Sequence, residues 1–426
     1  MSVVAYNKLS VAKITELYHD LHKKYDAFQK MGLRLDMSRG KPSKQQLDLS
    51  SGLLDCLSHD DYTSCTGVDC RNYGGLDGIM EMKRIFADIL DIDVTEVLVG
   101  GNSSLSMMFD NIASNMTHGV RDGIPWQRQG SIRFICPVPG YDRHFAMCDY
   151  FHIEMIPIPM KADGPDMDMV ETLVSGDPLI KGMFCVPIFS NPDGCVYSDA
   201  TVMRIAGLQP KAFDFRLYWD NAYCVHAFNG EVPKIPNILR ECEKVNNPHM
   251  PLIFTSFSKV SFSGAAVSAI ASSASNCQYI LKRMNIQTVG PDKLNQLRHV
   301  RFFGDVQGVR GHMRKMAENI KPKFDAVDEI LTRYLQGKEI AWWSKPNGGY
   351  FISFNSLNGC AKRIVQLCKE AGVTMTPAGA TFPYGRDPFD SNIRIAPTYP
   401  TLDELKLAME IFCAAVEIAS LEKLME

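Results

Sequence analysis

Hydrophobic and polar positions follow a helical period at the start of the chain. Ser10 precedes the first apolar position of this segment and is a candidate N-cap. The apolar residues recur every three or four positions, which predicts an amphipathic helix; they are Ile14, Leu17, Tyr18, Leu21, Tyr25 and Phe28. An irregular stretch follows, Met37–Pro42, with the sequence MSRGKP.

From about residue 95, short apolar runs alternate with longer segments of mixed polarity. The runs are rich in β-branched and aromatic residues, and they are Val97–Val99, Ile132–Cys136, Ile153–Ile158, Gly182–Phe189, Arg216–Trp219, Leu252–Ser256 and Ala265–Ile270. Strands of a parallel sheet are buried on both faces and therefore read as apolar runs. Because helix-length segments separate them, we expect an α/β domain with a mainly parallel, seven-stranded sheet between helices.

The pattern changes after about residue 300. Arg310–Leu335 and Ala361–Ala371 predict helices, Tyr350–Phe354 and Ile393–Ile395 predict strands, and Leu402–Leu421 predicts a terminal amphipathic helix. We interpret this as a smaller α+β domain that also includes the N-terminal helix. The expected boundaries are residues 1–62 and 301–426 for the small domain and residues 63–300 for the large one.

Composition and charge narrow the function. The chain has 426 residues, a formal net charge of −3 and thirteen cysteines. A near-neutral balance argues against a nucleic-acid binder, which would show a basic surplus. Without a signal peptide or an apolar run of about 18 residues, we expect a soluble, cytoplasmic protein with no membrane partner. The cysteines lack zinc-site spacing and predict free thiols and no metal site.

The main chemical signal is Lys259, at the end of the segment Thr255-Ser256-Phe257-Ser258-Lys259. A lysine that follows a buried strand among small hydroxyl residues can keep its amine neutral enough to form a Schiff base. A solvated strand end is the structural alternative.

Polar or aromatic residues follow other predicted strands. Asp220 stands where α/β sheets collect ligand-binding groups and could pair with a protonated ring nitrogen, or it could cap a helix. Asn191 lies in the turn Ser190–Gly194. Tyr141, in the segment PGYDRH, could stack on a planar cofactor.

Gly100-Gly101-Asn102-Ser103-Ser104 closes a strand and opens a helix. Backbone amides at a helix N-terminus, together with two hydroxyl groups, can bind a phosphate. The set of phosphate cradle, stacking ring, polar turn, acid and lysine is what pyridoxal 5'-phosphate requires.

With these segments in this order, the chain resembles the fold-type I, class I pyridoxal-phosphate-dependent aminotransferases. It looks closest to their aspartate-aminotransferase-like subgroup, which is related to MocR regulators. The resemblance covers the chain from MSRGKP to NIRIAP. It implies that Lys259 forms the Schiff base and shuttles the proton, that Asp220 binds the pyridine nitrogen, and that Tyr223 and Asn191 bind the phenolic oxygen.

The resemblance also implies roles for further residues. Tyr141 would stack on the ring, and His144 would support the acid. The phosphate ligands would be Ser103, Ser104, Ser256 and Ser258. Tyr73, in Asn72-Tyr73-Gly74-Gly75, would reach the phosphate of a neighbouring subunit, so a homodimer with shared active sites is expected.

Substrate contacts follow from the same resemblance. Arg394, in the segment NIRIA, would take the substrate α-carboxylate as a fork, with Gly40 and Asn191 beside it. We hypothesise that Arg143 binds the second carboxylate of aspartate or glutamate, since an unpaired buried charge is costly. A surface role for Arg143 is nearly as well supported, and Arg39, Lys41 and Arg301 are competing candidates.

One departure concerns the phosphate. The family usually carries an arginine seven or eight residues after the lysine, where this chain has Ala266 and Val267. The replacement could be serines such as Ser258, Lys282 or Arg283, or a basic residue in Arg298–Arg301.

The implied function is transfer of an amino group between an L-amino acid, best aspartate or glutamate, and a 2-oxo acid. Alternatives are a pyridoxal-phosphate enzyme of another type, such as a β-lyase or an aromatic or kynurenine aminotransferase, and a regulator that senses the cofactor. The regulator is disfavoured because the family-like segment starts within the first ~10–40 residues, too early for a DNA-binding domain of ~60 residues.

Overall fold

The computed structural model describes residues 4–426, so the first three residues of the expected segment 1–62 lie outside the described part. Its centre is an eight-stranded sheet with the order β2-β9-β8-β7-β6-β3-β4-β5. The strands are β2 (Val97–Val99), β3 (Arg133–Val138), β4 (Glu154–Lys161), β5 (Gly164–Pro165), β6 (Ile180–Cys185), β7 (Arg216–Asp220), β8 (Pro251–Ser256) and β9 (Ser268–Ala271).

Five adjacent strands, β4, β3, β6, β7 and β8, run parallel, whereas β9 is antiparallel to both of its neighbours. This confirms the expected α/β fold with a mainly parallel sheet. The eighth strand, β5, is a two-residue antiparallel return beside β4, too short to leave an apolar run in the sequence.

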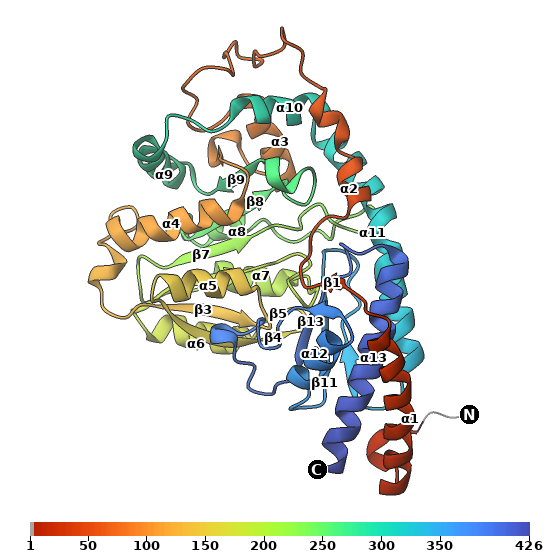
Figure 1. The fold of residues 1–426 in the computed structure, drawn as a ribbon. Coiled ribbons are helices and arrows are strands. Elements are labelled where there is room, and N and C mark those ends of the chain that lie inside the picture. Colours follow the sequence, from red (N-terminus) through yellow and green to blue (C-terminus); the bar gives the residue numbers. More distant parts are fainter. Residues whose placement is uncertain (1–3) are drawn as a thin grey trace.

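Helices cover both faces of this sheet (Figure 1). Alternate residues of one strand serve opposite faces: Tyr218 belongs to the core under α4 and α5, and Trp219 to the core under α3, α7 and α8. The helices that contribute to these two cores are α3 (Met80–Leu90), α4 (Ser104–His118), α5 (Asp142–Tyr150), α6 (Met167–Gly176), α7 (Asp199–Ala206), α8 (Ile238–Lys244), α9 (Ala274–Gln287) and α10 (Lys293–Phe303).

The two chain ends meet in a third core. In Figure 1 the first and last helices lie side by side, and the long α11 runs along them. Its elements are α1 (Val11–Lys30), α2 (Lys44–Asp48), α11 (Val306–Leu335), α12 (Ala361–Glu370) and α13 (Leu402–Met425), with strands β1 (Leu35–Met37), β10 (Ala341–Trp343), β11 (Ile352–Ser356), β12 (Val373–Met375) and β13 (Asn392–Ile395). Strand β1 pairs in parallel with β12, and β11 lies between β10 and β13.

Helix α11 joins the two parts of the molecule. Its first half, with Val309 and Met313, packs into a core of the large sheet, and its second half, with Phe324 and Leu331, packs against α1 and α13. As expected, Ser10 caps α1, accepting a hydrogen bond from the backbone of Lys13.

Two sequence expectations about these elements were wrong. The run Gly182–Phe189 is not one strand: β6 ends at Cys185, because Pro187 has no N–H for a ladder and Phe189 has a positive φ of 50°. Helix α13 is not amphipathic, since it lies between α1, α11 and α12 and is buried on all sides over most of its length, Glu417 included.

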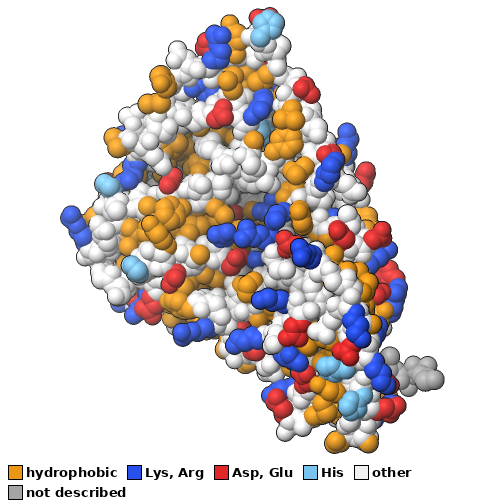
Figure 2. All heavy atoms as spheres, viewed as in Figure 1, with side chains coloured by type: hydrophobic (Ala, Val, Ile, Leu, Met, Phe, Trp, Pro, Cys, Tyr) orange, Lys and Arg blue, Asp and Glu red, His pale blue; other side chains and the backbone are white. Residues whose placement is uncertain are grey.

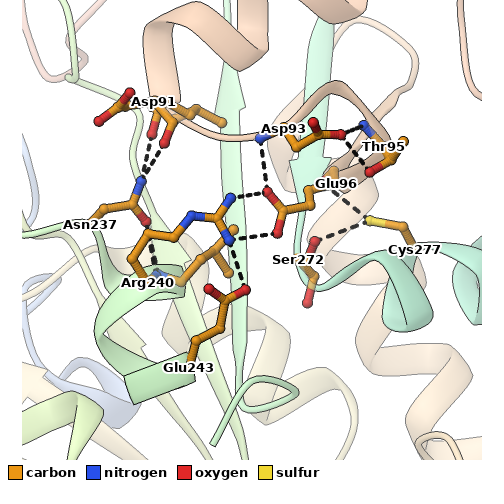
Figure 3. Close-up of polar contacts among 11 residues, drawn as sticks. Asp91, Asp93, Thr95, Glu96, Asn237, Arg240, Glu243, Ser272 and Cys277 are labelled. Carbon is orange, nitrogen blue, oxygen red and sulfur yellow. Dashed lines mark hydrogen bonds and ion pairs between the residues drawn. The ribbon is translucent and has the colours of Figure 1, made fainter. Parts of the chain in front are cut away.

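An ion-pair cluster fastens α8 to the edge of the sheet (Figure 3). Both Arg240 Nη atoms contact the carboxylate of the buried Glu96, with Nη1 3.0 Å from Oε1. Glu96 also accepts a hydrogen bond from the backbone N of Asp93, and Asn237 donates to the carbonyls of Leu90 and Asp91. The cluster ties together the start of β2, the end of α3 and α8.

No helix within residues 4–426 is both long and apolar enough to cross a membrane. All thirteen cysteines are free thiols, and most of them are buried.

Candidate active site

Lys259 lies in the turn that follows β8. Its Nζ is 5.0 Å from the ring centre of Tyr223 and 5.9 Å from that of Tyr350. Burial lowers the pKa of the Lys259 amine, the nearby Arg394 lowers it further, and the Asp220 carboxylate partly opposes both. The surroundings therefore favour an uncharged amine more than water does, as a nucleophile or a general base requires.

Asp220 ends β7 and is almost completely buried. His144 Nε2, on α5, lies 2.9 Å from its Oδ2, and the His144 ring stacks on Phe184 at 4.4 Å between centres. Asp220 Oδ1 is sealed from solvent and has no hydrogen-bond partner in residues 4–426. Since a buried acceptor without a donor is costly, this oxygen is suited to a ligand that brings a proton, such as a protonated ring nitrogen.

Two tyrosines lie close to this acid. Tyr223 is buried, and burial raises its pKa well above the usual value, with Tyr141 and Asp220 adding to the effect. Tyr141 is the N-cap of α5, and its ring meets that of His144 edge-on at 5.1 Å. Tyr223 is thus held as a phenol, able to donate a hydrogen bond.

The segment Gly100–Ser104 meets the lysine turn at the start of α4. Ser258 Oγ donates to the carbonyl of Asn102 at 3.0 Å, and Ser256 Oγ lies 3.1 Å from Ser258 Oγ. Ser103 is the N-cap of α4, but its side chain makes no capping bond. The helix amides and these hydroxyl groups form an arrangement that can bind an anion.

Arg394 comes from β13 and is buried. Its guanidinium lies 4.8 Å from the ring centre of Phe351, and its Nη1 lies 3.4 Å from Asn191 Oδ1. Gly40 packs on the same ring, where an added Cβ would lie 2.5 Å from Phe351 Cζ. Gly40 and Arg394 therefore meet at Phe351, and Asn191 joins them through Arg394.

Three other sequence candidates are exposed, and one of them is paired with a carboxylate outside this group. Tyr73 is 81% exposed, in a segment where Lys293 Nζ holds the carbonyls of Asn72 and Gly74. Arg143 is exposed and forms no ion pair within residues 4–426. Arg301 is committed to Asp61 by two bonds of 2.7 and 2.8 Å, which weakens it as a ligand for substrate or phosphate.

Comparison with known proteins identifies the family of this chain. The family model described as aspartate amino-transferase matches residues 9–426. The chain belongs to the aspartate aminotransferase family. It is therefore an aminotransferase, an enzyme that moves an amino group between small molecules.

Relatives of this aminotransferase support the same assignment. An aspartate aminotransferase of Corynebacterium glutamicum is 43% identical over 423 residues, which cover 99% of this chain and 98% of that protein. The crystal structure of an aspartate transaminase from Corynebacterium glutamicum has a TM-score of 0.97 at 42% identity and covers 99% of this chain and 100% of its own.

Enzymes of much lower sequence identity share this fold. LysN, an α-aminoadipate aminotransferase from Thermus thermophilus in complex with N-(5'-phosphopyridoxyl)-L-leucine, has a TM-score of 0.75 at 16% identity, covering 98% of this chain and 97% of its own.

Four residues near the candidate site were missed by sequence reasoning. His226 Nε2 and Tyr350 Oη lie 3.3 and 3.4 Å from the carbonyl oxygen of Lys259, and Gln46 donates to Tyr350 Oη. Asp142 contacts Arg394. The segment Pro346-Asn347-Gly348-Gly349, a break before a strand, was the available signal for Tyr350. The only signal for Asp142 was its position between Tyr141 and Arg143.

A further cavity of the aminotransferase borders the segment that follows Asp220. It measures about 990 Å³ and lies between the end of α3, the segment 229–237 and α11. Lys and Arg side chains gather near the middle of the face shown in Figure 2, beside a hollow.

Proposed function

We propose that this aminotransferase depends on pyridoxal 5'-phosphate and transfers the amino group of aspartate or glutamate to a 2-oxo acid. The observation that carries the proposal is the pairing of Lys259, whose amine pKa is lowered by burial, with the buried, unpartnered Asp220 Oδ1. A lysine amine and a fixed acid opposite it are the two groups that this cofactor requires.

The residues present suit each part of the cofactor. Asp220 would hold the ring nitrogen, Tyr223 and Asn191 the phenolic oxygen, and Tyr141 a face of the ring. The phosphate would lie among the α4 amides and the hydroxyls of Ser103, Ser104, Ser256 and Ser258. Because Ala266 and Val267 stand where the family carries arginine and Arg301 is held by Asp61, we propose that hydroxyls and amides take over most of that anion binding.

When bound, pyridoxal 5'-phosphate supplies an aldehyde that condenses with amines and a pyridinium ring that withdraws electrons from the bonds at Cα. Asp220, held by His144, keeps the proton on the ring nitrogen. Lys259, with its lowered amine pKa, would accept the proton from the substrate Cα and return it to the aldehyde carbon of the cofactor, on the other side of the amino nitrogen. Arg394 binds the α-carboxylate and so fixes which bond at Cα faces Lys259.

The substrate assignment rests on the relative named aspartate aminotransferase. We propose that Arg143 binds the distal carboxylate, because it is an exposed cation one residue from the His144 that supports Asp220 and makes no ion pair within residues 4–426. An Arg143→Ala variant should raise the KM for aspartate and leave alanine turnover unchanged. An unchanged preference for aspartate would move the role to Arg39 or Lys41.

We also propose that the enzyme is a homodimer in which Tyr73 completes the partner's site. The exposure of Tyr73 and the bracing of its segment by Lys293 support this. Mixing Tyr73→Ala and Lys259→Ala chains should restore roughly a quarter of wild-type activity, since heterodimers would contain one intact site. Activity that stays lost, with particles of twice the 47.6 kDa chain mass, would contradict the shared site.

Three further expectations stay predictions. They are the domain boundaries at residues 62 and 300, the link to the MocR-related subgroup, and a cytoplasmic location, which the free cysteines support.

The decisive experiment is Lys259→Ala. Turnover of aspartate with 2-oxoglutarate should fall at least roughly a thousandfold, because the base and nucleophile is lost, while unfolding by urea stays near wild type. Lys321→Ala, at an exposed lysine of α11, is the matched control. Turnover at the native rate in Lys259→Ala would refute the proposal.

A further inference from the structure

The guanidinium of Arg394 is already engaged by a carboxylate of the protein itself. Asp142 Oδ1 lies 2.7 Å from Arg394 Nη1, and Asn191 Oδ1 lies 3.4 Å from the same nitrogen. The Arg394 side chain is 6% exposed, whereas that of Asp142 is 36% exposed. The pair therefore joins a buried, fixed cation to a carboxylate that still borders solvent.

The three nitrogens of Arg394 differ in their access. Nε is sealed from solvent and has no partner in residues 4–426. Nη2 makes no hydrogen bond within the described part of the chain and is not sealed. A carboxylate that approaches Arg394 at the Nη1–Nη2 end to form two parallel bonds meets Asp142 at one of the two positions.

We propose that Asp142 is an internal competitor for the substrate carboxylate and thereby sets the affinity of the enzyme for its substrates. This rests on the proposed role of Arg394 as the carboxylate-binding residue. The substrate must displace Asp142 from Nη1 to gain both bonds, and Asp142 returns when the product leaves. Apparent affinity is then reduced by the fraction of time for which the fork is occupied.

The fold makes this exchange inexpensive. Asp142 is the first residue of α5, and the N-cap of this helix, Tyr141, makes no side-chain capping bond. A displaced carboxylate can stay near the helix amides and the positive end of the helix dipole. Between turnovers, Asp142 neutralises a buried guanidinium that would otherwise lack a counter-charge.

The test is the binding of succinate to the cofactor-loaded enzyme, measured by isothermal titration calorimetry. Asp142→Asn should bind succinate about three- to twentyfold more tightly than wild type, because the fork is no longer occupied. Asp142→Ala should show the same gain. If Asp142 had only a structural role, replacing it would weaken succinate binding.

Matched controls separate the outcomes. Asp149→Asn removes the same charge from an exposed position of α5 and should leave succinate affinity within twofold of wild type. An equal gain of succinate affinity in Asp149→Asn, or no gain in Asp142→Asn, would refute the proposal that Asp142 competes with the substrate. Arg394→Met should abolish succinate binding; if binding persists, the proposed role of Arg394 itself is wrong.

Discussion

At the scale of single residues, Asp220 combines full burial with one unused acceptor. Its Oδ2 is held by His144, and its Oδ1 has no partner among the described residues. Replacing it by Asn keeps the shape but removes the charge that retains a proton on the ring nitrogen. We expect Asp220→Asn to lower kcat by roughly 10²–10⁴-fold, measured in the aspartate assay. Wild-type kcat in a folded Asp220→Asn protein would show that the acid has no such role.

Gly40 offers a second test at this scale. Its missing Cβ allows Phe351 to lie against the loop, and Phe351 in turn lies under Arg394. Gly40→Ala should push this ring toward Arg394 and raise the KM for aspartate severalfold, with a smaller effect on kcat. Gly176→Ala, where an added Cβ meets nothing within 4 Å, is the control and should leave both constants unchanged. A KM for Gly40→Ala equal to that of the control would contradict the argument.

At the scale of elements, apolar runs located most strands of the large sheet because buried parallel strands leave a continuous signal. The short pair β1 and β12 left none, since each contributes three residues and their pairing joins positions far apart in the chain. The end of β6 was misplaced because Val186, Ile188 and Phe189 are buried without being paired in a strand. Burial is what hydrophobicity reports, and strand pairing is only one way to reach it.

The Arg240 cluster is the prediction that belongs to this scale. Arg240 neutralises Glu96, whose side chain is only 8% exposed, and so joins α8 to the start of β2 (Figure 3). Arg240→Gln should lower the free energy of unfolding by about 1–3 kcal/mol, because it strands a buried carboxylate. Urea denaturation measures this change.

The control for Arg240→Gln is a substitution of Glu243, the second partner of Arg240. The Glu243 side chain is 42% exposed, so Glu243→Gln should change the free energy of unfolding by less than about 0.5 kcal/mol. Equal effects of the two variants would show that burial of Glu96 does not decide the strength of the cluster.

At the scale of the whole molecule, the sequence indicated the residues around Lys259 and Asp220 because each follows a strand of one sheet, and parallel strands end at a common edge. It could not indicate contacts made between the two parts of the chain. Tyr350 and Arg394 reach the site from the region built by both chain ends, and Asp142 has its partner 252 positions away. Such contacts depend on how the two regions meet, which no local pattern encodes.

The lysine turn depends on three buried histidines that arrive from different regions of the chain. His226 Nε2 lies 3.3 Å from the Lys259 carbonyl oxygen, His312 Nε2 lies 2.9 Å from that of Val260, and His299 Nε2 lies 2.8 Å from Ser261 Oγ. Burial lowers the pKa of all three: that of His226 to about 3, with Lys259 adding to the effect, and that of His299 to about 4. The lysine turn is therefore held by neutral imidazoles.

The pH dependence of stability follows with a definite sign. An unfolded chain protonates histidine near pH ~6.5, so the unfolded state binds more protons than the folded state between pH ~6.5 and these lowered pKa values. The stability that these neutral histidines contribute is fully present above pH ~6.5 and is lost as the pH falls toward 4 and 3.

Between pH 7.5 and 5.0 each of His226 and His299 should account for on the order of 2 kcal/mol of lost stability, measured by urea unfolding. His299→Gln should flatten this dependence, whereas His59→Gln, at a 90% exposed side chain, should leave it unchanged. Equal slopes in wild type and His299→Gln would show that this imidazole is not held neutral by the fold.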